Sequence, residues 1–134
     1  MGTFLSELAT VTDYVNDSRV LLQDLISPFR YDDPSLLTAL NLTLFEARRI
    51  RPDLFVLRRR APGEPEVPQF NQNQGQPVPM EPQFRLGILH GMTGYALERD
   101  QEDIQDVRAA MFLATFASIL TGTRPGSGAG GQPQ

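Results

Sequence analysis

Cysteine, lysine and tryptophan are all missing from this 134-residue chain, and it has a single histidine, His90. The lack of cysteine excludes a disulfide framework, a thiolate metal site and a cysteine nucleophile. One imidazole is too few for a histidine-based metal centre. All twelve basic residues are arginines, which we attribute to the codon usage of a GC-rich genome. The alternative is a preference for guanidinium groups at interfaces.

The chain also lacks a long hydrophobic run. Its most apolar stretch, "AAMFLATFASIL" at 109–120, is too short to span a bilayer. The N-terminus has no basic segment followed by an apolar one, so we expect no secretory signal and a protein that is soluble where it is made. A net charge of −4 and a pI near 4.9 argue against nucleic-acid binding by overall charge.

Catalytic motifs are missing as well. The sequence contains no phosphate-binding loop, no dinucleotide fingerprint and no zinc-protease or EF-hand pattern. His90 stands between hydrophobic helical positions, where a packed or surface histidine is the simplest interpretation. The pairs Asp32-Asp33 and Glu102-Asp103 stand at predicted helix starts, where capping explains them. We therefore predict no catalytic residues, no cofactor, no metal and no enzymatic activity.

Apolar spacing predicts four helices, over about 10–26, 33–50, 83–99 and 100–121. Asp33 and Asp100 are expected to cap the second and fourth, Pro52 to end the second, and Gly122 to follow the last. The stretch "DLFVL" at 53–57 alternates like a short strand, with Leu54 and Phe55 packing inward. Three glycines, Gly87, Gly91 and Gly94, either let a neighbouring helix approach closely or mark a local irregularity.

Between the second and third helices, residues 61–82 contain six of the eleven prolines. Such a segment is either disordered or an extended arm or β-ribbon that orders on a partner, with Val67, Phe70 and Val78 as anchors. The predicted fold is thus all-α: a four-helix bundle-like domain over 1–121 with this insertion, followed by a flexible C-terminal arm over 122–134.

Charge is distributed unevenly. Residues 48–60 carry six arginines against one acid, and residues 98–108 carry five acids against two arginines. These segments can neutralise each other within the fold or pair between copies in a head-to-tail oligomer. Contact of Arg58, Arg59 and Arg60 with DNA phosphates is a third interpretation. The candidate interface residues are Arg48, Arg49, Arg51, Arg58, Arg59, Arg60, Phe70, Glu98, Glu102, Asp103, Asp106 and Arg124.

Four segments together resemble the head-to-tail adaptor, or connector, proteins of tailed bacteriophages. They are "LLQD" at 21–24, "YDDPSLLTALN" at 31–41, "ARRIRPDLF" at 47–55 and "YALERDQEDIQDVRAAMFLATFASIL" at 95–120. They cover about half of the chain and touch all four predicted helices.

The resemblance implies a small helical virion subunit that is not an enzyme. It would form a homo-oligomeric ring, typically a dodecamer, beneath the portal of the capsid, extend the DNA channel and dock tail proteins, after assembly in the host cytoplasm. Genomic DNA would pass through without sequence-specific binding. The 122–134 tail becomes the candidate portal arm, the 61–82 insertion the candidate neighbour or tail contact, and Glu98 or Glu102 candidates for the channel wall.

Two other functions stay open on sequence grounds. One is a ring-forming subunit of a DNA-packaging motor, similar to a terminase small subunit, which would bind duplex DNA with steep salt dependence. The other is a cellular helical interaction or regulatory module, which would be a monomer or dimer with no affinity for a portal.

Overall fold

The computed structural model describes residues 7–24, 30–56, 60–100 and 103–122, with the side chains of residues 100 and 103–106 left undescribed. Its described residues form five helices and no strand, so the protein is all-α as predicted. The helices are α1 (Val11–Leu22), α2 (Asp33–Ile50), α3 (Asp53–Val56), α4 (Pro82–Asp100) and α5 (Asp103–Thr121).

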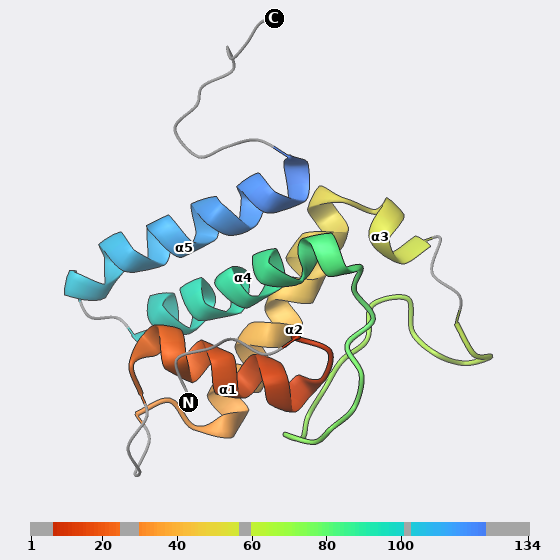
Figure 1. The fold of residues 1–134 in the computed structure, drawn as a ribbon, viewed down its shortest axis with the longest axis horizontal. Coiled ribbons are helices and arrows are strands. Elements are labelled where there is room, and N and C mark those ends of the chain that lie inside the picture. Colours follow the sequence, from red (N-terminus) through yellow and green to blue (C-terminus); the bar gives the residue numbers. More distant parts are fainter. Residues whose placement is uncertain (1–6, 25–29, 57–59, 101–102, 123–134) are drawn as a thin grey trace, which may run out of the picture.

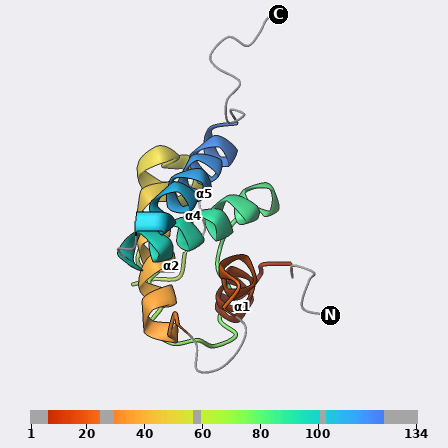
Figure 2. The ribbon, with the colours of Figure 1, turned by 90° about the vertical axis from the view of Figure 1, so that its left-hand side faces the viewer.

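The helices do not adopt the expected four-helix bundle arrangement. In Figure 1, α5, α4 and α1 lie one below the other, while α2 runs across behind them. Figure 2 shows the same relation from the side, with α2 along one edge of the molecule. The closest packing joins α4 with α5, and α2 packs mainly against α4. The arrangement is therefore a layer of three helices with a fourth laid across its back.

Helix α1 is shorter than the predicted 10–26. Thr10 caps it in a capping box with Asp13, each side chain accepting from the other residue's backbone N–H. The helix ends at Leu22 because Gln23 takes a left-handed conformation, with φ 59°. Asp24 then accepts hydrogen bonds from the backbone N–H groups of residues 30 and 31, which turns the chain toward α2.

Two local predictions around α2 need correction. The N-cap is Asp32, whose Oδ1 accepts from Ser35 N at 2.9 Å, and not Asp33. Asp33 instead pairs with Arg19 of α1 at 2.9 Å. Pro52 does end α2, but the "DLFVL" strand is wrong, because the Pro52 carbonyl accepts from two backbone N–H groups and closes the single turn of α3. As predicted, Leu54 and Phe55 of this turn are buried.

Helix α4 agrees closely with the predicted 83–99. It continues through Asp100, so Asp100 ends α4 rather than starting the next helix, and α5 begins at Asp103. Gly122 follows α5 with φ +78°, the backbone conformation expected after a helix end.

The glycines of α4 explain its close approach to α5. A Cβ atom built on Gly91 would come within 2.6 Å of Thr43 Cγ2 and 2.9 Å of Phe116 Cδ1. Larger residues would hold α5 and α2 away from α4. The structure thus favours the close-packing interpretation of these glycines over local irregularity.

The predicted 61–82 insertion, whose last residue begins α4, forms no β-ribbon; its only ladder contact is an isolated bridge between Thr10 and Pro77. It packs instead on its own domain. Asn41 of α2 binds both backbone groups of Phe70, accepting from its N–H at 2.9 Å and donating to its carbonyl at 2.8 Å. The predicted anchors are buried together with one methionine, and the set is Val67, Phe70, Val78 and Met80.

Candidate functional site

The arginines near the end of α2 are paired with nearby carboxylates of the same chain. Arg49 contacts Glu46 at 2.7 Å, one turn earlier, and this carboxylate raises the pKa of Arg49. Arg48 reaches Glu66 of the insertion at 3.0 Å, so this pair ties the insertion to α2. Both arginines are therefore engaged within the fold.

Arg51 joins three parts of the molecule. Its guanidinium pairs with Asp53 of α3 at 2.9 Å and donates to the Leu120 carbonyl at the end of α5 at 2.7 Å. It also lies 5.1 Å from the centre of the Phe84 ring at the start of α4. The hydrogen bond from Arg51 lowers the pKa of Asp53. Arg51 is therefore a structural residue that fixes α3, α4 and α5 at one end of the domain.

The remaining predicted interface residues are not brought into one site. Phe70 is buried, whereas Arg60 and Glu98 are exposed. Arg58, Arg59, Glu102 and Arg124 lie outside the described residues, as do the side chains of Asp103 and Asp106. Among the described residues, the basic segment at 48–60 takes its carboxylate partners from positions 46, 53 and 66 rather than from the acidic segment.

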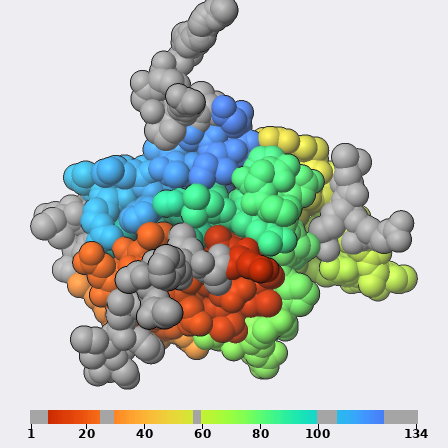
Figure 3. Space-filling view, viewed as in Figure 1, coloured from red at the N-terminus to blue at the C-terminus, as the bar shows by residue number. Residues whose placement is uncertain are grey.

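A surface that the charge pattern did not reveal lies on α5. From Ala109 to Thr121 this helix has no charged residue. It lies at the edge of the three-helix layer, where it forms the upper border of the view in Figure 3. Val107 and Met111 project outward with 67% and 65% of their surface exposed. A helix that is apolar on all sides is normally buried on all sides. The exposed outer face of α5 is therefore unusual for a helix of this composition.

A pocket opens beside this face, between α4 and α5. It has a volume of about 180 Å³ and is lined by His90, Arg108, Met111, Phe112 and Thr115. The rings of His90 and Phe112 stack with their centres 5.5 Å apart. Burial lowers the pKa of His90, so its imidazole is neutral at pH 7, and its buried Nδ1 has no hydrogen-bond partner. The pocket is thus mostly apolar.

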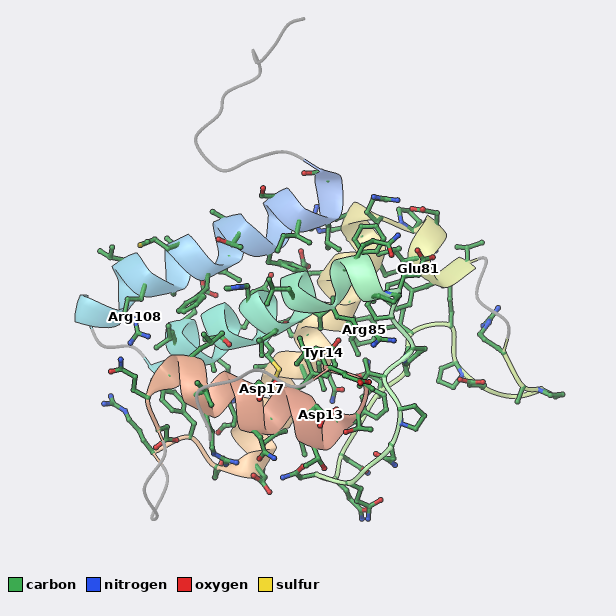
Figure 4. All side chains as sticks on the ribbon, viewed as in Figure 1. Asp13, Tyr14, Asp17, Glu81, Arg85 and Arg108 are labelled. Carbon is green, nitrogen blue, oxygen red and sulfur yellow. The ribbon has the colours of Figure 1, made fainter. Side chains whose placement is uncertain are left out.

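Arg108 supplies the positive charge of this pocket. It lies where the first turns of α5 approach the end of α1, as Figure 4 shows. Its guanidinium donates to the Leu21 carbonyl at 2.9 Å and lies 5.8 Å from the centre of the Phe112 ring. These contacts hold the guanidinium at the rim, where it can meet a carboxylate of an incoming partner.

A second exposed apolar stripe runs along α2. Leu42 and Phe45 are 39% and 50% exposed, and Thr38 and Arg49 continue the same helical face. Helix α2 forms the back of the molecule in Figure 1, whereas the pocket is lined by α4 and α5 and its Arg108 reaches the Leu21 carbonyl of α1. The chain therefore presents two apolar surfaces on different sides.

The described residues show no group of three or more histidine and acidic side chains that could hold a metal ion. Within the same residues, every helix is too short or too polar to cross a membrane. Comparisons of the chain with protein-family models, with curated proteins and with solved structures find no match.

Proposed function

We propose that this chain is the structural subunit of a head-to-tail adaptor ring in the virion of a tailed bacteriophage. The observation that carries the proposal is the outer face of α5, which is uncharged over 109–121 yet exposed at Met111, with Val107 exposed one turn earlier. Exposing apolar surface to water is unfavourable in free energy, and contact with another protein buries that surface. The role is assembly and not catalysis.

Ring formation requires two different surfaces on each subunit. A head-to-tail contact joins one surface of a subunit to another surface of its neighbour, and it closes into a ring when the rotation between neighbours allows. The α5 face with its pocket and the α2 stripe supply such a pair of surfaces. A ring, here proposed as a dodecamer, gains stability because every subunit is held by two contacts at once.

The charge distribution fits a channel through which DNA moves. The chain carries a net charge of −4, and Arg48, Arg49 and Arg51 are each engaged with a carboxylate. These three arginines are therefore less available to phosphates, which suits a channel that DNA passes without being held. This pairing favours the adaptor over a packaging-motor subunit that grips DNA. Glu98, which is exposed, is our candidate for the channel wall.

The proposed partners are the portal on one side and tail proteins on the other. The 122–134 segment is the candidate portal arm. The 61–82 insertion is the candidate neighbour or tail contact, and its first residues, Ala61 to Gly63, are exposed. Assembly would take place in the host cytoplasm, before the completed ring becomes part of the virion.

The test mixes the purified chain with portal rings from candidate phages and images the mixture by electron cryomicroscopy. We expect a ring of added density on one portal. Met111→Arg, a change at a 65% exposed position that leaves the core intact, should remove this density. Val56→Arg, on α3 and 49% exposed, is the matched control and should retain it.

Two results would overturn the proposal. Tight, salt-sensitive binding to duplex DNA would identify a packaging subunit instead. A stable monomer or dimer that binds none of the portal rings would identify a cellular interaction module.

A further inference from the structure

The pocket between α4 and α5 is large enough in volume for one aromatic ring. An engineered apolar cavity of about 150 Å³ in another protein binds benzene, and this pocket measures about 180 Å³. Its walls include the Phe112 ring, and the His90 ring stacks on that ring with an angle of 30° between the planes. A phenyl group entering from outside would find aromatic surface on one side and the Met111 thioether on another, contacts that both favour aromatic guests.

The same chain carries a matching group elsewhere. Among the described residues, the large hydrophobic side chains that are exposed include only one aromatic, Phe45, at 50%. It stands on the α2 stripe beside Leu42, one turn earlier, and is followed directly by Glu46. Phe45 does not fill the pocket of its own chain, because the pocket is lined by residues of α4 and α5 and Phe45 is 50% exposed.

One pair of opposite charges lies beside the two surfaces, while Arg49, on the same helical face as Phe45, is already paired with Glu46. Arg108 is held at the rim of the pocket by the Leu21 carbonyl, and Glu46 flanks Phe45 on α2. Glu46 already binds Arg49 at 2.7 Å. A carboxylate has lone pairs for more than one donor, so it can accept from Arg108 of a neighbour without releasing Arg49.

From these observations we infer that the pocket binds Phe45 of a second copy of this chain. The α2 stripe of one subunit lies along the outer face of α5 of the next, Phe45 enters between His90 and Met111, and Glu46 meets Arg108. This inference rests on the proposed ring and specifies its subunit contact. The contact is head-to-tail, since its two surfaces belong to different sides of the chain.

The absence of cysteine in the chain makes cross-linking a clean test. Thr38→Cys marks the α2 stripe and Ala114→Cys marks the α5 face; both positions are exposed and neither is the anchor. The two proteins are mixed with a short bismaleimide, alone and with portal rings. We expect the mixed pair to cross-link at least about tenfold faster than either protein with itself, because the contact raises the local concentration of the two thiols.

Anchor variants then test Phe45 itself. Phe45→Arg in the Thr38→Cys protein should abolish the mixed cross-link. Val56→Arg, which replaces an equally exposed apolar residue on α3, should leave it unchanged. Circular dichroism of each variant confirms that the helices are retained.

The outcomes separate this inference from the proposed function. Preferred cross-linking of Ala114→Cys with itself would indicate a symmetric α5–α5 contact and overturn the inference. Rings that form on the portal with Phe45→Arg as readily as with the unaltered chain would also overturn it, while leaving the adaptor proposal standing. No assembly of the unaltered chain, alone or on any portal, would remove the proposed function and this inference with it.

Discussion

Helix α5 and the insertion at 61–82 present opposite cases of how apolar surface is used. The insertion is polar and rich in proline, yet its apolar residues Val67, Phe70 and Val78 are all buried against the same domain. Helix α5 is far more apolar, yet it leaves Val107 and Met111 exposed. A partner-binding surface is therefore better sought where apolar area remains after the chain has folded than in the segment that looks least structured.

The difference arises from geometry. The insertion follows α2 and α1 closely and is fixed by hydrogen bonds, such as those from Asn41 to Phe70 and from Val78 N–H to the Ala9 carbonyl. Helix α5 packs mainly on the glycine-bearing face of α4 and only lightly on α2. One side of α5 is consequently buried and the other is open.

The largest expected effect compares the two faces of α5 directly. Phe116 is 2% exposed and packs against Gly91, so Phe116→Ala should lower the free energy of unfolding by about 3–5 kcal/mol. Met111→Ala, on the open face, should change it by less than about 0.5 kcal/mol. Chemical denaturation followed by circular dichroism measures both. Equal losses would show that Met111 is part of the core and would remove the distinction between the faces.

The attachment of the insertion depends on Asn41. Asn41→Ala leaves both backbone groups of the buried Phe70 without their partner, which should destabilise the protein by about 1–3 kcal/mol. We also expect faster proteolysis within 61–82. Gln72→Ala, an exposed change in the same insertion, is the control. Unchanged cleavage in the Asn41 variant would mean that burial of Phe70 alone holds the insertion.

The close approach of α4 and α5 can be tested at Gly91. Gly91→Ala should destabilise by about 1–3 kcal/mol through overpacking, since its Cβ would meet Thr43 at 2.6 Å. The higher helix propensity of alanine offsets about 1 kcal/mol of this. Gly75→Ala, where a Cβ meets nothing within 4 Å, should not destabilise. A thermal melt in which both variants match the unaltered protein would contradict the packing described for α4.

The smallest expected effect concerns pH and His90. Burial lowers the pKa of His90 below its ordinary 6.5, so just below pH 6.5 the unfolded chain binds more protons than the folded one. Stability should therefore fall as the pH drops from 6.5 toward the folded pKa. Comparing the unfolding free energy of the unaltered protein and His90→Gln across this range isolates the contribution. A difference that does not change with pH would show that His90 titrates normally.

The spacing of apolar residues and the positions of proline and glycine predicted much of the fold. The apolar spacing indicated α2 and α4 nearly to the residue, and Pro52 and Gly122 marked helix ends correctly. The errors concerned which of two neighbouring residues caps a helix and which conformation a short segment adopts. Asp32 and Asp33 are both competent caps, and only the pairing of Asp33 with Arg19 decides between them. The "DLFVL" segment is too short for alternation to distinguish a strand from one helical turn.

The candidate site was harder to predict. Clustered arginines suggested an interface, but Arg48, Arg49 and Arg51 pair with Glu66, Glu46 and Asp53, so these three charges are satisfied locally. The open face of α5 was present in the sequence only as high hydrophobicity. A hydrophobic helix at the edge of a layer and one at its centre have the same pattern, and only the three-dimensional packing separates them.

The most direct test of the central claim is the accessibility of the outer face of α5 in the assembled protein. Ala110→Cys, at an exposed position, introduces the single thiol of the chain, and its labelling rate by a maleimide is measured with increasing protein concentration and with portal rings. We predict rapid labelling in the dilute protein and strong protection on assembly, while Gly75→Cys stays reactive throughout. Unchanged labelling of residue 110 in particles that have assembled on a portal would contradict the account.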